Sequence, residues 1–89
     1  MAWTIEYDSH TLAILRKLDR AVRKQILDYM DNRIARAENP RDFGKPLGGG
    51  RAGLWRYRVR DYRIICRIED DNLVVLVIDV GHRSTIYDD

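Results

Sequence analysis

The side chains with the clearest chemical potential are arginines gathered in one short stretch of the chain. Between positions 51 and 67 arginine occurs six times, against a single acidic residue, Asp61. These arginines are Arg51, Arg56, Arg58, Arg60, Arg63 and Arg67. A guanidinium binds phosphate through two parallel hydrogen bonds and stays charged at any working pH. The stretch therefore predicts a surface that holds the phosphate backbone of RNA or DNA, with RNA favoured.

Two neighbouring strands would place most of these arginines on one surface. Because side chains alternate along a strand, Arg56, Arg58 and Arg60 are expected to share one face. The other face, with Trp55, Tyr57 and Val59, is expected to meet the core. Arg63 and Arg67 are expected on the same face of the next strand, since its apolar residues need the opposite side. A solvated strand face without a ligand is the alternative interpretation.

The elements that position these strands begin with a strand and two helices. Residues 3–7 alternate apolar and polar side chains, which predicts a half-buried strand. Asp8 or Ser9 can cap a first helix, and Asp19 can end that helix and cap a second one. The second helix carries an apolar stripe at spacings of three and four up to Ala37, and this stripe should lie on the sheet.

Three strands at close spacing follow a glycine-rich loop, which is expected to act as a hinge. They span residues 54–60, 62–69 and 73–80, and their short connections require an antiparallel meander. The last strand is apolar at consecutive positions, which predicts a central strand covered on both faces. The expected fold is α+β: an N-terminal strand, a two-helix hairpin and a three-stranded antiparallel meander, forming one sheet packed on the helices.

Composition limits the broad class of the protein. With 89 residues and 45% hydrophobic content, the chain can close one core, so residues 1–89 are expected to form a single domain. Cys66 is the one cysteine, and no run reaches the roughly 18 apolar residues of a membrane span, so we expect a cytoplasmic protein without a signal peptide or membrane segment. One cysteine and two distant histidines have no metal-ligand spacing, and neither a metal nor a cofactor is expected.

The end of the chain makes the pattern more specific. The run Leu-Trp-Arg-Tyr-Arg-Val-Arg-Asp-Tyr-Arg-Ile is followed by an apolar strand and then by Val-Gly-His-Arg, with a tyrosine four residues further on. This combination resembles the RelE family of bacterial toxins, and the order of the elements matches that family's fold over essentially the whole chain. Lysines of the best-known pattern are replaced by arginine at positions 56 and 58.

The resemblance implies the toxin of a type II toxin-antitoxin pair, which enters the ribosome and cuts messenger RNA. It also implies an antitoxin from the same operon that inactivates the toxin, in a complex expected to bind operator DNA through the antitoxin. By position, Arg63 and Arg83 match arginines near the scissile phosphate, and Tyr87 matches the catalytic tyrosine. The RNA-binding residues expected beside them are Arg56, Arg58, Arg60 and His82, with the direction of His82 left open.

Cleavage of this kind needs no metal, because a 2′-hydroxyl of the RNA attacks the adjacent phosphate. A tyrosine has an unperturbed pKa near about 10, and nearby arginines favour its phenolate form. Tyr87 is therefore expected to act as the base, while the arginines hold the negative charge that develops.

Two other functions fit the same sequence. A ParE-like toxin shares the outline of the RelE fold but inhibits DNA gyrase and cuts no RNA, so it needs no catalytic tyrosine. A non-enzymatic module that binds nucleic acid or protein would need no more than the arginine face.

Overall fold

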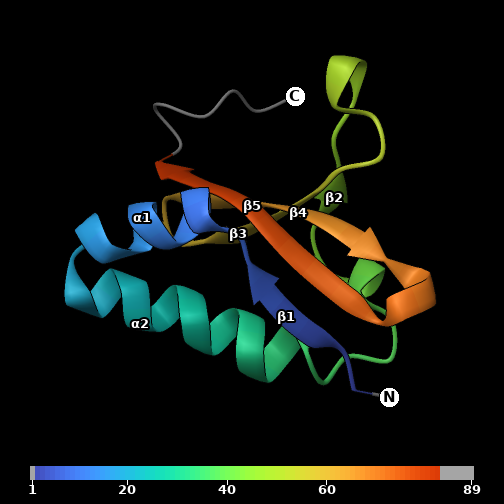
Figure 1. Cartoon of the computed structure of the whole chain (residues 1–89), viewed down its shortest axis with the longest axis horizontal. Coiled ribbons are helices and arrows are strands. Elements are labelled where there is room, and N and C mark those ends of the chain that lie inside the picture. The colour runs from blue at the N-terminus through green and yellow to red at the C-terminus, as the bar shows by residue number, and fades with distance from the viewer. Residues whose placement is uncertain (1, 83–89) are drawn as a thin grey trace.

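The computed structural model of the chain describes residues 2–82, and its elements follow the expected order (Figure 1). The sheet consists of β1 (Thr4–Tyr7), β2 (Lys45–Pro46), β3 (Trp55–Val59), β4 (Tyr62–Glu69) and β5 (Val74–His82). The helices are α1 (Ser9–Lys17) and α2 (Arg20–Asp28), and α2 continues as a π-helix over Tyr29–Ile34. Single 3₁₀ turns occupy Pro40–Asp42, Gly49–Arg51 and Asp70–Asn72.

Both predicted helix caps are present. The carboxylate of Asp8 accepts a hydrogen bond of 2.8 Å from the Thr11 amide, and that of Asp19 accepts one of 3.0 Å from the Ala21 amide. These bonds satisfy amides at the helix starts that have no partner within the helix. The Thr11 hydroxyl, which is fully buried, donates to the carbonyl of Val77 at 3.0 Å and so attaches α1 to β5.

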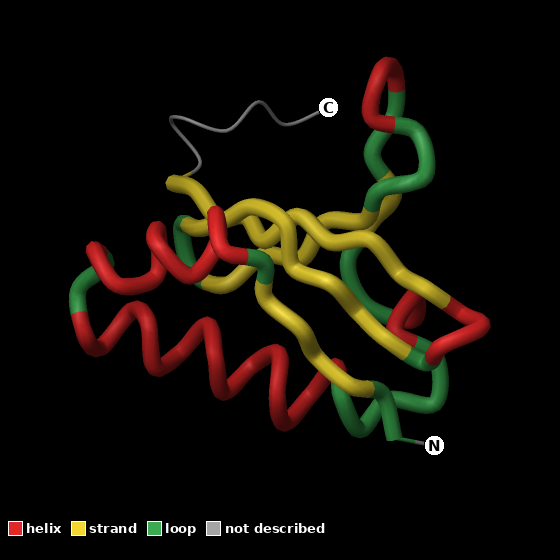
Figure 2. The backbone as a smooth tube through the Cα atoms, viewed as in Figure 1, coloured by secondary structure: helices red, strands yellow, loops and turns green. Residues whose placement is uncertain are grey.

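The sheet has the order β1-β5-β4-β3-β2 (Figure 2). Strands β3, β4 and β5 form the predicted antiparallel meander, and β1 pairs with β5 in parallel. The short β2 was not expected. It pairs antiparallel with Trp55 and Arg56 at the outer edge of the sheet, a position where Pro46 is tolerated because one side of an edge strand needs no amide donor. The α+β fold class is confirmed.

The core lies between the helices and one face of the sheet. Ile26, Met30 and Ile34 of the second helix are fully buried and belong to the same cluster as Tyr57 and Ile64. Their spacing of four residues along the helix is the predicted apolar stripe. Burial of these side chains is the main source of the fold's stability.

The prediction that β5 is covered on both faces is wrong. Val75, Val77 and Val80 are buried, whereas Val74 and Leu76 on the other side of the strand are partly exposed. Both helices contribute to the single core cluster on one side of the sheet, so the other side of β5 keeps its apolar side chains partly in contact with solvent. Within residues 2–82 no helix is both long and apolar enough to cross a membrane.

Candidate nucleic-acid interface

The register of β3 and β4 brings the central arginines together. Arg58 lies directly opposite Arg63, and Arg56 lies opposite Ile65. The neighbouring pair of Tyr57 and Ile64 is fully buried on the core side of the same two strands. Since side chains alternate along each strand, the arginines occupy the face away from the helices, as predicted. We call the side chains of Arg56, Arg58, Arg63 and Arg67 the arginine face.

The members of the arginine face differ in their exposure to solvent. Arg56 and Arg63 are buried, with 7% and 6% of their surface exposed, whereas Arg58 and Arg67 are exposed. Like charges directly opposite each other disfavour a sheet, and Arg58 and Arg63 are such a pair. An anion between the two guanidiniums would relieve that repulsion. Burial restricts the motion of Arg63, so it meets such an anion with little reorganisation.

Arg60 departs from the predicted alternation. Strand β3 ends at Val59, and Arg60 adopts the left-handed conformation, with a φ of 56°, in the turn to β4. Its Nη1 donates to Oε1 of Gln25 on α2 at 3.1 Å, so its guanidinium reaches toward the helix and does not continue the row of Arg56 and Arg58. The expectation of three aligned arginines on β3 is therefore wrong. The turn still brings Arg60 near Arg58 and Arg63. The three side chains line a hollow of about 30 Å³ together with Asp61 and Tyr62.

Lys45 is a cation that the sequence pattern did not reveal. It lies opposite Arg56 through the pairing of β2 with β3. Gly44 allows the chain before β2 to approach β3 closely. It has a φ of 72°, and a Cβ there would stand 2.3 Å from the carbonyl oxygen of Arg56. The indole of Trp55 adds a hydrogen bond of 2.7 Å to the carbonyl of Phe43. A two-residue strand gives too short a pattern for prediction, although Pro46 is compatible with a sheet edge.

The remaining predicted residues fall in different places. His82 pairs with Tyr62 across β4 and β5, and the two rings meet edge to face with centroids 5.4 Å apart. This register puts His82 on the Tyr62 side of the sheet, opposite to Arg63, so a shared contact with one RNA strand has no support from its position. Arg83 and Tyr87 lie outside the described residues, and their catalytic roles stay predictions.

Other reactive side chains within the described range offer little competing chemistry. Burial raises the pKa of the Cys66 thiol far above its ordinary value, so this cysteine stays protonated and is a poor nucleophile. Burial also raises the pKa of Tyr57, whose hydroxyl donates to the carbonyl of Pro40 at 2.7 Å. His10 and Asp79 form an exposed pair at 3.1 Å. No three potential metal ligands gather among residues 2–82.

Comparison with known proteins gives this arrangement a family. Residues 5–87 match the family described as the ParE toxin of the type II toxin-antitoxin system, parDE. The chain belongs to the RelE/ParE superfamily of type II toxins.

Individual relatives align with this toxin over nearly its full length. It is 31% identical to the mRNA interferase toxin RelE of Escherichia coli, covering 98% of this chain and 92% of that protein. It is 29% identical to the toxin RelG of Mycobacterium tuberculosis, covering 98% of both chains. The toxin-antitoxin complex RelBE2 of Mycobacterium tuberculosis contains a chain with 26% identity and a TM-score of 0.86, over 94% of each chain. The chain is therefore a RelE-type toxin of a type II toxin-antitoxin system, in a family that includes proteins named mRNA interferases.

Proposed function

We propose that this toxin is a ribosome-dependent endoribonuclease that cuts messenger RNA. The observation that carries the proposal is the direct opposition of Arg58 and Arg63 on a rigid sheet face, with Arg63 buried and Arg56 beside them. Two adjacent guanidiniums suit a phosphodiester, whose oxygens can accept hydrogen bonds from both. The similarity to proteins named mRNA interferase supports messenger RNA as the nucleic acid.

In the proposed reaction the 2′-hydroxyl of one nucleotide attacks the adjacent phosphorus. A bond forms between the 2′-oxygen and phosphorus while the bond to the 5′-oxygen of the next nucleotide breaks. The site must accept the proton of the 2′-hydroxyl, hold the additional negative charge on the phosphate and return a proton to the departing 5′-oxygen. Arginine, with a pKa above about 12, stabilises that charge well and donates a proton poorly.

The proposed catalytic roles separate stabilisation of the phosphate charge from proton transfer. Arg63 and Arg83 hold the scissile phosphate, and Tyr87 accepts the proton from the 2′-hydroxyl. A guanidinium beside a phenol favours the phenolate form, so the proposed role of Tyr87 requires arginines close to it. Arg56 and Arg58 bind the flanking RNA backbone, and the exposed Lys45 extends the same cationic surface.

The proposed partners are the ribosome, messenger RNA and an antitoxin from the same operon. The solved RelBE2 structure that resembles this chain is a toxin-antitoxin complex, which supports an antitoxin as the inhibitor of this chain. The complex would bind operator DNA through the antitoxin.

Primer extension on messenger RNA from cells that briefly express the toxin tests the proposal. Wild type is expected to produce new RNA ends within translated codons, and Arg63→Ala, Arg83→Ala and Tyr87→Phe are expected to remove them. New ends of equal abundance in all three variants would reject the assigned catalytic residues. Arrest of growth without new ends in the wild type would reject the nuclease itself.

Inhibition of DNA gyrase is the second candidate, because the matching family is described as the ParE toxin. This function needs no proton transfer at a phosphate. It therefore predicts that Tyr87→Phe stays toxic and that purified toxin inhibits DNA supercoiling, whereas the nuclease predicts relief of toxicity and unchanged supercoiling.

A further inference from the structure

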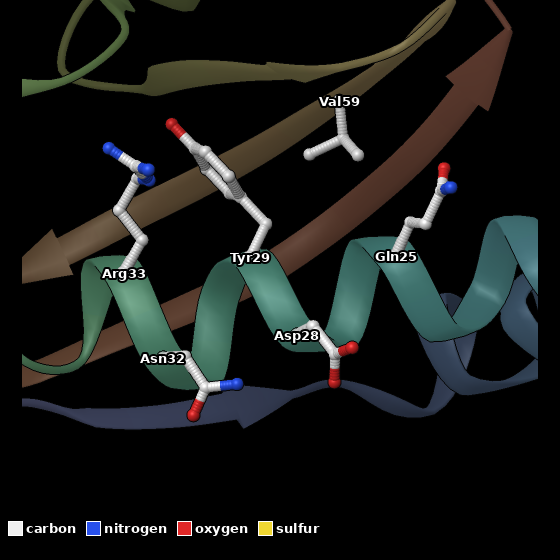
Figure 3. A pocket seen from close by; sticks show the side chains of 6 residues that line it. All are labelled: Gln25, Asp28, Tyr29, Asn32, Arg33 and Val59. Atoms are coloured by element: carbon white, nitrogen blue, oxygen red, sulfur yellow. The ribbon is translucent and has the colours of Figure 1, made fainter.

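Two hollows include the side chain of Tyr29 in their linings. The larger, of about 600 Å³, lies along the second helix and is lined by Gln25, Asp28, Tyr29, Asn32, Arg33 and Val59 (Figure 3). The smaller, of about 260 Å³, is lined by Tyr29, Gly44, Lys45, Arg56 and Arg58. We call them the helix-side groove and the cationic pocket. They share Tyr29, so one bound segment can enter both.

The groove is a product of local structure. Strand β2 pairs with Trp55 and Arg56, so it does not extend along the part of β3 that ends at Val59. The π-helix begins at Tyr29, and such wide turns are frequent at functional sites. Figure 3 shows Gln25, Tyr29 and Arg33 projecting on the same side of the helix as Val59, whereas Asp28 and Asn32, which also line the hollow, project on the other side of the helix.

Existing contacts hold the walls of the groove in place. Arg60 donates to Gln25 near one end, and the Arg33 guanidinium lies 5.6 Å from the ring centre of Phe43 near the other. Tyr29 packs against the fully buried Tyr57, with ring centres 6.0 Å apart. A ligand would therefore meet a largely preformed surface, which lowers the cost of binding.

We propose that an extended, acidic segment of the antitoxin crosses Tyr29 and fills both hollows. Successive side chains of an extended chain point in different directions, so one segment that passes Tyr29 can place a side chain in each hollow. An apolar side chain packs on Val59 and the Tyr29 ring in the helix-side groove. A carboxylate enters the cationic pocket, where Lys45, Arg56 and Arg58 supply the complementary charge. This inference rests on the proposed antitoxin partner.

The chemistry of the helix-side groove favours a peptide over RNA. Val59 and the ring of Tyr29 offer an apolar contact that an apolar side chain of a peptide can use and a nucleic-acid backbone cannot. The cationic pocket, in contrast, includes the two arginines assigned to the RNA backbone. The antitoxin segment and RNA therefore compete for Arg56 and Arg58, which explains how binding at the edge of the sheet silences the toxin.

Charge reversal in the groove provides the test, with Arg36→Glu as the matched control. Arg33 and Arg36 are both exposed, but only Arg33 lines the groove. Binding of the purified antitoxin from the same operon is measured by calorimetry, and inhibition of translation is measured in a cell-free system. We expect Arg33→Glu to weaken antitoxin binding at least roughly tenfold, as for a central interface residue, and Arg36→Glu to change it less than about twofold. Translation inhibition by either variant without antitoxin should match the wild type.

A second variant tests the shape of the groove without reversing a charge. Asn32 is exposed on the groove rim, so Asn32→Trp should be tolerated by the fold and obstruct a bound segment. Antitoxin affinity equal to wild type in both Arg33→Glu and Asn32→Trp would overturn the inference while leaving the proposed function in place. Loss of translation inhibition with intact antitoxin binding would place RNA in the groove instead. Absence of antitoxin binding by the wild type would reject the proposed partner, and the inference with it.

Discussion

The two faces of β4 show how one strand serves stability and chemistry separately. On the core side, Ile64 and Cys66 are fully buried and belong to the cluster that joins the sheet to the helices. On the other side, Arg63 is buried beside Arg58, and Arg67 is exposed. A substitution on one side should therefore change the free energy of unfolding, and a substitution on the other side should change the rate of RNA cleavage. The predictions below test this separation, from the largest expected effect to the smallest.

Truncation on the core side should have the largest effect on stability. Ile64→Ala removes buried methyl groups from a packed site, which costs about 2–5 kcal/mol of unfolding free energy. Urea denaturation followed by circular dichroism measures the loss. The fraction of molecules that stays folded should cleave RNA at the wild-type rate. A cleavage defect in fully folded Ile64→Ala would contradict the separation of the two faces.

Truncation on the arginine face should reduce the rate of RNA cleavage far more than the free energy of unfolding. Arg63→Ala removes a donor to the developing phosphate charge and is expected to slow cleavage by about two orders of magnitude. Single-turnover cleavage of messenger RNA on purified ribosomes measures the rate. Arg67→Ala, four residues further along the same strand, is the control and should retain most of the activity. A wild-type rate in Arg63→Ala would remove it from the catalytic centre.

The remaining arginines should act on binding and not on the chemical step. Each backbone contact to single-stranded RNA contributes about −0.7 to the slope of log affinity against log salt concentration. The double variant Arg56→Ala/Arg58→Ala should therefore flatten that slope by about 1.4. Fluorescence anisotropy with a labelled RNA at several salt concentrations measures it. Arg16→Ala/Arg36→Ala, which removes the same charge from exposed positions outside the arginine face, should leave the slope unchanged.

The smallest effect concerns an ion pair remote from both faces. Both terminal nitrogens of Arg41 donate to the Asp70 carboxylate at 2.8 Å, and this hydrogen bonding holds the pKa of Asp70 below its ordinary value. The stabilisation is thus fully present above the ordinary carboxylate pKa of about 4 and is lost as pH falls through the lowered value.

Comparison with Asp70→Asn isolates that contribution. The wild type should be slightly more stable than the variant at neutral pH, because exposed ion pairs contribute little. The difference should shrink as the pH falls below about 4. Denaturant unfolding at a series of pH values measures it, and a difference that grows toward acid pH would contradict the assignment.

The sequence predicted the parts of the fold that local patterns control. Asp8 and Asp19 cap helices because a short carboxylate side chain reaches the exposed amides of the first turn. Alternation placed Arg56, Arg58 and Arg63 on one face because their apolar neighbours need the core. These are contacts within a few residues or between adjacent strands, and each leaves a periodic signal.

The errors arose where long-range packing or backbone conformation decides the outcome. Arg60 does not lie beside Arg56 and Arg58 because the turn holds it in the left-handed conformation. Its hydrogen-bond partner, Gln25, is 35 positions away in the sequence. The exposure of Leu76 depends on both helices packing on one side of the sheet, which an apolar run cannot reveal. Lys45 and Tyr29 joined the candidate sites only through tertiary contacts.

The parallel pairing of β1 with β5 has a consequence for the time course of folding. Its register joins Thr4 to Val74, so the N-terminal strand finds its partner only after the helices and most of the meander have been synthesised. Contacts between positions so distant along the chain slow folding, because a long loop must close before they form. A newly made toxin molecule should therefore pass through an interval in which its sheet is incomplete. That delay gives an antitoxin time to arrive before the toxin has finished folding.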